Sequence, residues 1–189
     1  MHSSILTDLQ GQLLIAMPGL TDPLFNGSLV YILEHSDEGA VGLIINKPLD
    51  MKVDDVLLQI DENYAGQNYR QAVLKGGPVS DNRGFVLHTL ADDRWQHQVK
   101  LADELFLSTS ADILEALAKG VAIGEFQLAL GYSGWSAGQL EEELASNSWL
   151  NVEMDKNILF TLPIEQRLEA AANKLGINYN LLCATGGSA

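Results

Sequence analysis

The sequence is poor in cysteine: Cys183 is the one cysteine among its 189 residues. An internal disulfide is therefore impossible, which fits a reducing compartment. Cys183 has no basic neighbour in the sequence that would activate the thiol, so we interpret it as an incidental or buried side chain and not as a nucleophile. No apolar run approaches the roughly 18 residues of a membrane-spanning helix. The N-terminal residues do not resemble a signal peptide, and we expect a cytoplasmic location without a membrane partner.

Basic side chains are also scarce. Eleven Lys and Arg residues stand against twenty-five Asp and Glu residues, which gives a formal net charge of −14. Such a surface repels phosphates, and the bases are scattered singly along the sequence. This composition argues against direct nucleic-acid binding and leaves a protein or a small ligand as the expected partner.

Apolar residues, in contrast, are plentiful at 47%. A chain of this length and composition can bury a core of its own, and no stretch resembles a linker, so we predict a single domain over residues 1–189. The last residues, 186–189, are Gly-Gly-Ser-Ala and are expected to fray.

Hydrophobic periodicity predicts about nine strands and four helices in a mixed order. Residues 29–33 form an almost continuous apolar run, as expected for a strand covered on both faces, and 40–45 pairs with it in a hairpin. The other predicted strands are 12–17, 72–74, 84–89, 105–107, 126–130, 150–154 and 158–160, and the predicted helices are 53–60, 111–119, one from about 139, and 163–175. Asp50 is the expected N-cap of the first helix. The irregular alternation favours an α+β fold with mixed β-sheets.

The densest motif lies between Gly131 and Trp149. Ser136 and Gln139 have the spacing of a capping box, and the acidic run at 141–143 suits the first turns of a helix. We interpret Trp135 and Trp149 as core anchors. The glycines at 131, 134 and 138 indicate a turn, in which Gly134 is expected to need a positive φ.

A second glycine motif, Gly-Gly-Pro-Val at 76–79, is typical of a tight turn. It lacks the Gly-Lys-Ser/Thr ending of a phosphate-binding loop and a following helix, so we reject that function for it.

Candidate site residues lie at the polar ends of early strands. His35 and His88 each end an apolar strand, and if those strands are neighbours the imidazoles could meet at one edge, with Glu34 beside them. The alternative is that both histidines are hydrogen-bonded structural residues. Asn46 either contributes an amide to the same site or bonds its own backbone in a turn. No ligand spacing predicts a metal or another cofactor, and no catalytic residue can be assigned.

The ordered set of motifs resembles the YqgE/AlgH family across about residues 13–176. The residues that carry the resemblance are Ala-Met-Pro-Gly-Leu at 16–20, Asp-Pro at 22–23, Phe25, Glu-His at 34–35, Glu-Gly-Ala at 38–40, Gly42, Asn-Lys-Pro at 46–48, Gly-Gly-Pro-Val at 76–79, Leu-His at 87–88, Leu-Gly-Tyr-Ser-Gly-Trp at 130–135, Gln-Leu-Glu at 139–141 and Glu-Leu at 143–144. The resemblance implies a compact α+β fold with a small barrel-like sheet in a bacterial cytosolic protein. It implies a proposed role in transcriptional regulation of alginate production, with no agreed mechanism and no catalytic residues.

Three functions remain open. The first, which we favour, is a non-enzymatic regulatory module that binds a protein or small ligand near Glu34, His35, Asn46 and His88. The second is a hydrolase or metal-dependent enzyme that uses His35 and His88, or Ser133 in a sequence similar to a nucleophile elbow. The third is a direct DNA-binding transcriptional regulator, which the net charge opposes.

Overall fold

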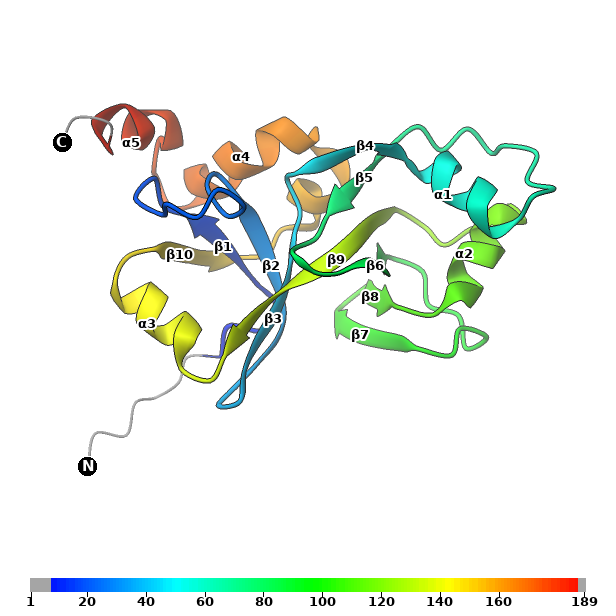
Figure 1. The fold of residues 1–189 in the computed structure, drawn as a ribbon, viewed down its shortest axis with the longest axis horizontal. Helices are drawn as coiled ribbons and strands as arrows, with labels where there is room; N and C mark the ends of the chain where they lie inside the picture. Colours follow the sequence, from blue (N-terminus) through cyan, green and yellow to red (C-terminus); the bar gives the residue numbers. More distant parts are fainter. Residues whose placement is uncertain (1–7, 187–189) are drawn as a thin grey trace.

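Ten strands form one sheet that curls into a half-barrel in the computed structural model, which describes residues 8–186 (Figure 1). Neighbouring strands follow the order β10-β1-β2-β3-β9-β6-β8-β7, while β4 and β5 attach beside this path. The strands are β1 (Gln12–Ala16), β2 (Leu29–Ser36), β3 (Gly39–Ile44), β4 (Pro48–Lys52), β5 (Ala72–Lys75), β6 (Val79–His88), β7 (Gln98–Ala102), β8 (Leu105–Ser108), β9 (Phe126–Ser136) and β10 (Trp149–Glu153). The predicted α+β class with a barrel-like sheet is confirmed. Residues 187–189 of the predicted frayed tail lie outside the described residues.

Apolar side chains cover both faces of the sheet, as the continuous run in β2 predicts. Leu29, Tyr31 and Leu33 of β2 join a cluster that draws on strands from β10 to β8, and this cluster fills the concave side of the half-barrel. Val30 and Ile32, which alternate with them, join a second cluster on the opposite face. Successive side chains of a strand point to opposite faces, so a strand buried on both sides has no polar alternation.

The C-terminal segment packs into the concave side. It comprises a π-helix, η1 (Asn157–Thr161), a 3₁₀ turn, η2 (Ile164–Gln166), and α4 (Arg167–Lys174), followed by α5 (Tyr179–Gly186). Ile158, Leu159, Ala171 and Ala172 of this segment belong to the concave cluster. The strand predicted at 158–160 is therefore wrong. Asp155 accounts for the difference, because its carboxylate accepts the N–H of Asn157 and its carbonyl accepts that of Ile158, which starts a helical turn.

A buried arginine fixes α4 against the sheet. Arg167 is only 4% exposed, and its guanidinium donates to the carbonyl of Ile45 at 2.7 Å and to the side-chain oxygen of Gln127 at 2.9 Å. Burial lowers the pKa of Arg167 to about 10, so the side chain keeps its charge at neutral pH. Carbonyl oxygens from β9 and from the end of β3 therefore solvate this cation inside the fold.

The remaining helices cover the convex side at opposite ends of the sheet (Figure 1). α1 (Val53–Ile60) and α2 (Ala111–Ala118) pack against each other at one end, and α3 (Gln139–Ala145) contacts β9 and β10 at the other. Lys52, and not Asp50, is the N-cap of α1, because Asp50 belongs to β4. Among residues 8–186, every helix falls short of the length or hydropathy that a membrane crossing requires.

The sheet branches at Gly131, in the middle of β9. On one edge of β9, β5 pairs in parallel with residues 129–130, and β3 pairs with residues 133–136. The Gly76-Gly77 segment passes across this point, and a Cβ on Gly77 would lie 2.1 Å from the carbonyl carbon of Tyr132. Neither Gly76 nor Gly77 has a positive φ. They are required because two backbones approach too closely for any side chain.

The turn before α3 also differs from the prediction. Gly131 and Gly138 have positive φ, of 71° and 78°, whereas Gly134 does not. Gly138 precedes the helix and Ser136 still belongs to β9, so the predicted capping box is half formed. The Gln139 side chain accepts the backbone N–H of Ser136 at 3.1 Å, but the Ser136 hydroxyl bonds Gln139 and not the helix backbone.

Candidate functional site

The four predicted site residues do not meet in one place. His35 pairs with Ala40 across β2 and β3, and Ala40 pairs with Trp135 near the end of β9. His88 pairs with Phe126, the first residue of β9. At about 3.3 Å per residue, the positions of Trp135 and Phe126 in β9 are roughly 30 Å apart. The imidazoles therefore belong to opposite ends of the sheet.

His35 connects β2 to helix α3. Its ring is 3% exposed, Nδ1 accepts the backbone N–H of Leu9 at 3.2 Å, and Nε2 lies 3.0 Å from a carboxylate oxygen of Glu141. Since Nδ1 accepts, the proton resides on Nε2 and is donated to Glu141. Glu34, the neighbour of His35, is exposed beside a β-bulge.

Asn46 and Lys47 hold the loop between β1 and β2. The Asn46 side chain accepts the N–H of Leu29 at 2.7 Å and donates to the carbonyl of Gly27 at 2.9 Å. Lys47 donates to the carbonyls of Leu24 and Asn26. The alternative in which Asn46 bonds its own backbone in a turn is therefore wrong. The side-chain amide instead stabilises a loop that is distant in the sequence. Burial lowers the pKa of Lys47.

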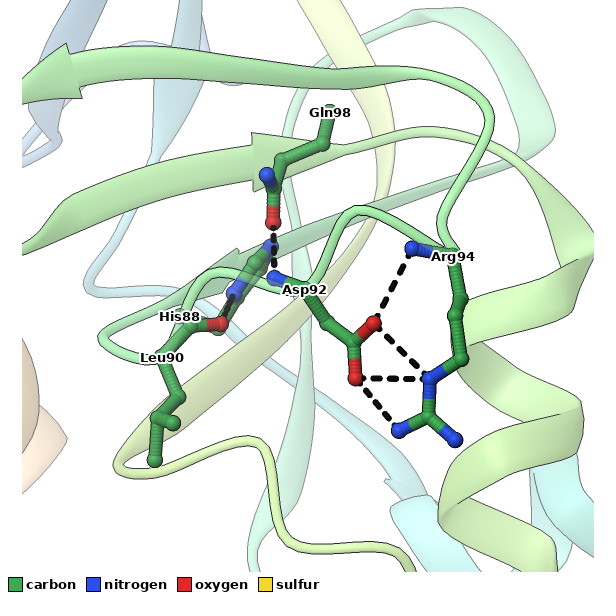
Figure 2. Close-up of polar contacts among 5 residues, drawn as sticks. All are labelled: His88, Leu90, Asp92, Arg94 and Gln98. Atoms are coloured by element: carbon green, nitrogen blue, oxygen red, sulfur yellow. Dashed lines mark hydrogen bonds and ion pairs between the residues drawn. The ribbon is translucent and has the colours of Figure 1, made fainter.

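His88 is fully buried between the sheet and the loop that follows β6 (Figure 2). Its Nδ1 donates to the carbonyl of Leu90 at 2.9 Å, and its Nε2 accepts from the hydroxyl of Ser108 at 2.9 Å. Trp95 packs edge-on against the ring, with centroids 5.0 Å apart. Burial lowers the pKa of His88, which keeps the imidazole neutral.

The loop over His88 is held by its own polar contacts. In Figure 2, the backbone N–H of Asp92 donates to the side chain of Gln98, and the Asp92 carboxylate accepts from both the backbone and the guanidinium of Arg94. These contacts, together with the Leu90 carbonyl on His88, give the loop a defined path. His88 acts here as an internal anchor for the loop.

Ser133 is also buried, and its hydroxyl donates to the carbonyl of Gly76 at 3.2 Å. His35, Asn46, His88 and Ser133 thus all have protein partners in the structure. A binding role for Glu34, His35, Asn46 and His88 stays a prediction. Within residues 8–186, no three His, Cys, Asp or Glu side chains gather as potential metal ligands.

The acidic run of α3 has specific partners that the sequence does not predict. One carboxylate oxygen of Glu143 accepts the indole N–H groups of Trp135 at 2.9 Å and Trp149 at 2.8 Å, and the other accepts from Gln139 at 2.9 Å. Together with Glu141 on His35, these bonds attach α3 to the strands beneath it. The run is therefore not simply a solvated helix face.

A pocket opens where the two ends of the curled sheet approach each other. We call it the seam pocket, because residues beside the edge strands β10 and β7 line it together. Its volume is about 530 Å³, within the range of small-molecule sites. The lining comes from the start of β1 (Gly11, Gln12), from Tyr31, from the β7–β8 connection (Ala102, Asp103, Leu105) and from residues 153–156 (Glu153, Met154, Asp155, Lys156).

Tyr31 supplies the distinctive chemistry of the seam pocket. The residue is 1% exposed and sits in the concave cluster, yet its hydroxyl has no hydrogen-bond partner among residues 8–186. Every fully enclosed side-chain nitrogen or oxygen in this part of the chain does have a partner. The Tyr31 oxygen is therefore reached from the pocket that the residue lines. Burial raises the pKa of Tyr31 to about 12, so the phenol is a protonated donor.

One ion pair connects the two sides of the seam, and two others lie within one side each. Lys156, directly before η1, contacts Glu104 at 2.8 Å, and Lys100 contacts Asp103 at 3.0 Å. Lys174 lies 3.8 Å from Asp155. Lys174 also donates to the backbone carbonyl of Glu153 at 3.1 Å.

Sequence reasoning misses the seam pocket because its lining comes from separate segments that share no motif. One signal was available. Tyr31 carries the one polar atom among the five side chains of the buried run 29–33, and a buried phenol usually finds a hydrogen-bond partner.

The fold and this pocket define a class of protein: an α+β half-barrel whose open seam is bridged by an ion pair beside a small pocket. The chain belongs to the AlgH-like family, whose model matches residues 13–180. This confirms the resemblance of the sequence motifs.

Relatives and solved structures cover the whole chain. A UPF0301 protein of Hahella chejuensis is 43% identical over 99% of this chain and 100% of its own. Another, from Pseudomonas putida, is 47% identical over 96% of each chain. The solution structure of the AlgH protein from Pseudomonas aeruginosa matches with a TM-score of 0.78 and 43% identity, covering 100% of both chains. A Corynebacterium diphtheriae protein has the same fold, with a TM-score of 0.73 at 18% identity, over 93% of this chain and 91% of that one.

Proposed function

We propose that this chain is a cytoplasmic, non-enzymatic regulatory protein that acts by binding a small ligand in the seam pocket and by contacts with a protein partner. The observation that carries the proposal is the buried Tyr31 hydroxyl, which is open to the pocket and has no hydrogen-bond partner among residues 8–186. Leu105 and Met154 provide apolar walls beside it. A pocket with apolar walls and few directed polar groups is the usual form of a small-molecule site.

The regulatory part of the proposal draws on the family and on charge. A relative of the same length is named AlgH, and the net charge of −14 disfavours a direct role on DNA. A ligand at the seam also gives the protein a way to respond to that ligand, because residues from both ends of the curled sheet line the pocket. A ligand that contacts both sides stabilises their closed arrangement.

A neutral fluorescent probe tests whether the seam pocket binds small molecules. N-phenyl-1-naphthylamine becomes brighter in an apolar site, and we expect saturable binding to the wild type. Ala102→Trp places a large side chain in the lining and should weaken this binding several-fold. The matched control is Ala137→Trp in the exposed turn before α3, which should bind like wild type. Equal binding by both variants, or none by the wild type, would remove the seam pocket as the site.

One contact keeps a hydrolase as a second candidate. The Ser108 hydroxyl donates to Nε2 of His88 at 2.9 Å, as a serine nucleophile does to its general base. Both side chains are fully buried, so an opening of the loop after β6 would be required. Labelling by a fluorophosphonate that is lost in Ser108→Ala and retained in Ser133→Ala would support this alternative over the binding protein.

A further inference from the structure

The seam pocket presents an unpaired hydrogen-bond donor between apolar walls, and the charged side chains that line it have partners or face away from it. From this geometry we propose that its ligand is a small uncharged molecule with an apolar body and one carbonyl oxygen, which accepts the hydrogen bond of the Tyr31 hydroxyl. The inference rests on the proposed function and specifies the ligand class of the same site.

The Tyr31 hydroxyl requires an acceptor on the ligand. Tyr31 is 1% exposed, its hydroxyl has no hydrogen-bond partner among residues 8–186, and a pKa of about 12 keeps the phenol protonated. A ligand without an acceptor would bury this donor unsatisfied, which costs affinity. A ligand donor would gain less than a carbonyl, because the phenol oxygen shares its lone pairs with the ring and accepts weakly.

The walls of the pocket favour an apolar body. Leu105 belongs to the concave cluster and Met154 packs against it, so hydrocarbon and a thioether line the pocket together with Tyr31. Methionine adapts its shape to an aromatic or aliphatic ligand because it has three rotatable bonds. A volume of about 530 Å³ leaves room for a body of one or two rings.

The charged residues of the lining disfavour a charged ligand. Asp103, Asp155 and Lys156 line the pocket, and each of them already takes part in an ion pair. An ionic ligand would therefore lose part of its hydration without meeting an unpaired counter-charge. The net charge of −14 disfavours an anion further.

Glu153 also lines the pocket, but its carboxylate faces away from it. Val152 belongs to the cluster that contains Tyr31 and Met154 packs against that cluster, whereas successive side chains of a strand point to opposite faces. The backbone carbonyl of Glu153 accepts from Lys174 at 3.1 Å. Among the described residues that line the pocket, no carboxylate is thus left to hold a cation inside it.

Four matched probes separate these requirements in titrations followed by amide NMR shifts. 4-Methylacetophenone carries the carbonyl, and 4-isopropenyltoluene replaces the carbonyl oxygen by a methylene group of similar shape. 4-Acetyl-1-methylpyridinium and 4-acetylbenzoate keep the carbonyl and add a positive or a negative charge. For wild type we expect 4-methylacetophenone to bind at least about tenfold more tightly than either ion, because the ions lose hydration without gaining a counter-charge.

Tyr31→Phe tests whether the carbonyl is bound by the phenol. It should weaken the binding of 4-methylacetophenone about three- to tenfold, the value of one hydrogen bond, and should not weaken that of 4-isopropenyltoluene. The melting temperature should stay at the wild-type value, because the lost hydroxyl has no hydrogen-bond partner among residues 8–186. Tyr132→Phe is the control, since Tyr132 packs against the same cluster but is not part of the lining, and it should keep both wild-type affinities.

Failure of this inference is distinguishable from failure of the proposed function. The uncharged carbonyl class would be overturned by an equal effect of Tyr31→Phe on 4-methylacetophenone and 4-isopropenyltoluene, by an ion that binds as tightly as 4-methylacetophenone, or by no binding of 4-methylacetophenone. If N-phenyl-1-naphthylamine still binds in an Ala102-dependent manner, the seam pocket remains a ligand site of another chemistry. If neither the naphthylamine nor 4-methylacetophenone binds, both proposals are wrong.

Discussion

Gly77 and Gly134 look equivalent in the sequence, but their surroundings differ sharply. A Cβ on Gly77 would meet backbone atoms of Tyr132 and Ser133 at 2.1–2.4 Å, whereas a Cβ on Gly134 would meet only the Tyr132 ring, at 3.8 Å. Gly77→Ala should therefore lower the free energy of unfolding by at least about 2 kcal/mol, since backbone atoms cannot move aside. Gly134→Ala should change it by less than about 1 kcal/mol, because its φ is ordinary.

Urea unfolding of the two variants beside wild type measures this difference. Equal losses of stability in Gly77→Ala and Gly134→Ala would show that the close approach at the branch of the sheet is not what requires Gly77. The expectation that Gly134 needs a positive φ came from its place in a glycine-rich turn. Only the backbone of the neighbouring segment distinguishes the two residues.

His88 predicts how stability depends on pH. Burial lowers its pKa in the folded protein, so as pH falls below about 6.5 the unfolded chain takes up a proton before the folded protein does. This proton uptake stabilises the unfolded state, and stability falls as the solution becomes more acidic. The contribution of one histidine is no more than about 2 kcal/mol between about pH 7 and about pH 5.

The change in the free energy of unfolding with pH tests this prediction. Absolute stabilities do not, because each substitution also alters the stability at any one pH. Unfolding by urea at about pH 7 and about pH 5 should show a smaller loss for His88→Gln than for wild type. His97→Gln, at an exposed position in the same loop, should keep the wild-type loss. A wild-type slope in His88→Gln would mean that other groups cause the acid sensitivity.

At the scale of elements, one side chain of α3 binds both tryptophans of the strands beneath it. Glu143 accepts the indole N–H groups of two buried tryptophans and the amide of Gln139. Glu143→Ala leaves both indole donors without partners and should lower the free energy of unfolding by about 2–4 kcal/mol. The neighbouring Glu142→Ala is the control, because Glu142 is exposed and its hydrogen bonds to described residues involve its backbone and not its carboxylate.

Unfolding followed by tryptophan fluorescence reports directly on this contact, since Trp135 and Trp149 are its donors. A stability of Glu143→Ala equal to that of Glu142→Ala would contradict the assigned role. The sequence predicts the helix and the tryptophan anchors here, but it cannot predict that Glu143 and not Glu142 points inward. That choice depends on the angle at which the helix leaves Gly138.

Other elements show the same division between what sequence can and cannot predict. The run 29–33 and its hairpin partner were predictable, because burial on both faces leaves a continuous apolar pattern. Residues 158–160 were not, since a short apolar run fits a strand or a helix equally and the Asp155 turn decides between them. The seam pocket was not predictable either, because its residues meet only when the whole sheet curls.

At the scale of the whole molecule, charge determines which partners are possible. In the structure, Lys100, Lys156 and Lys174 lie beside the seam, although they are scattered in the sequence. Their ion pairs with Asp103, Glu104 and Asp155 lie next to one another, because Asp103 and Glu104 are neighbours in the chain and so are Asp155 and Lys156. Each of these lysines already has a carboxylate partner, so the cluster offers no free positive surface for a phosphate backbone. The net charge of −14 adds long-range repulsion.

We therefore expect no shift of duplex DNA by micromolar protein in gel-shift experiments at about 0.15 M salt. Lowering the salt strengthens any binding that depends on phosphate contacts, so a measurement at about 0.05 M gives DNA the best opportunity. The matched variant replaces Lys100, Lys156 and Lys174 by glutamine. A shift of wild type that weakens with salt and disappears in this variant would establish the seam lysines as a DNA-binding surface, and the regulatory role would then be direct.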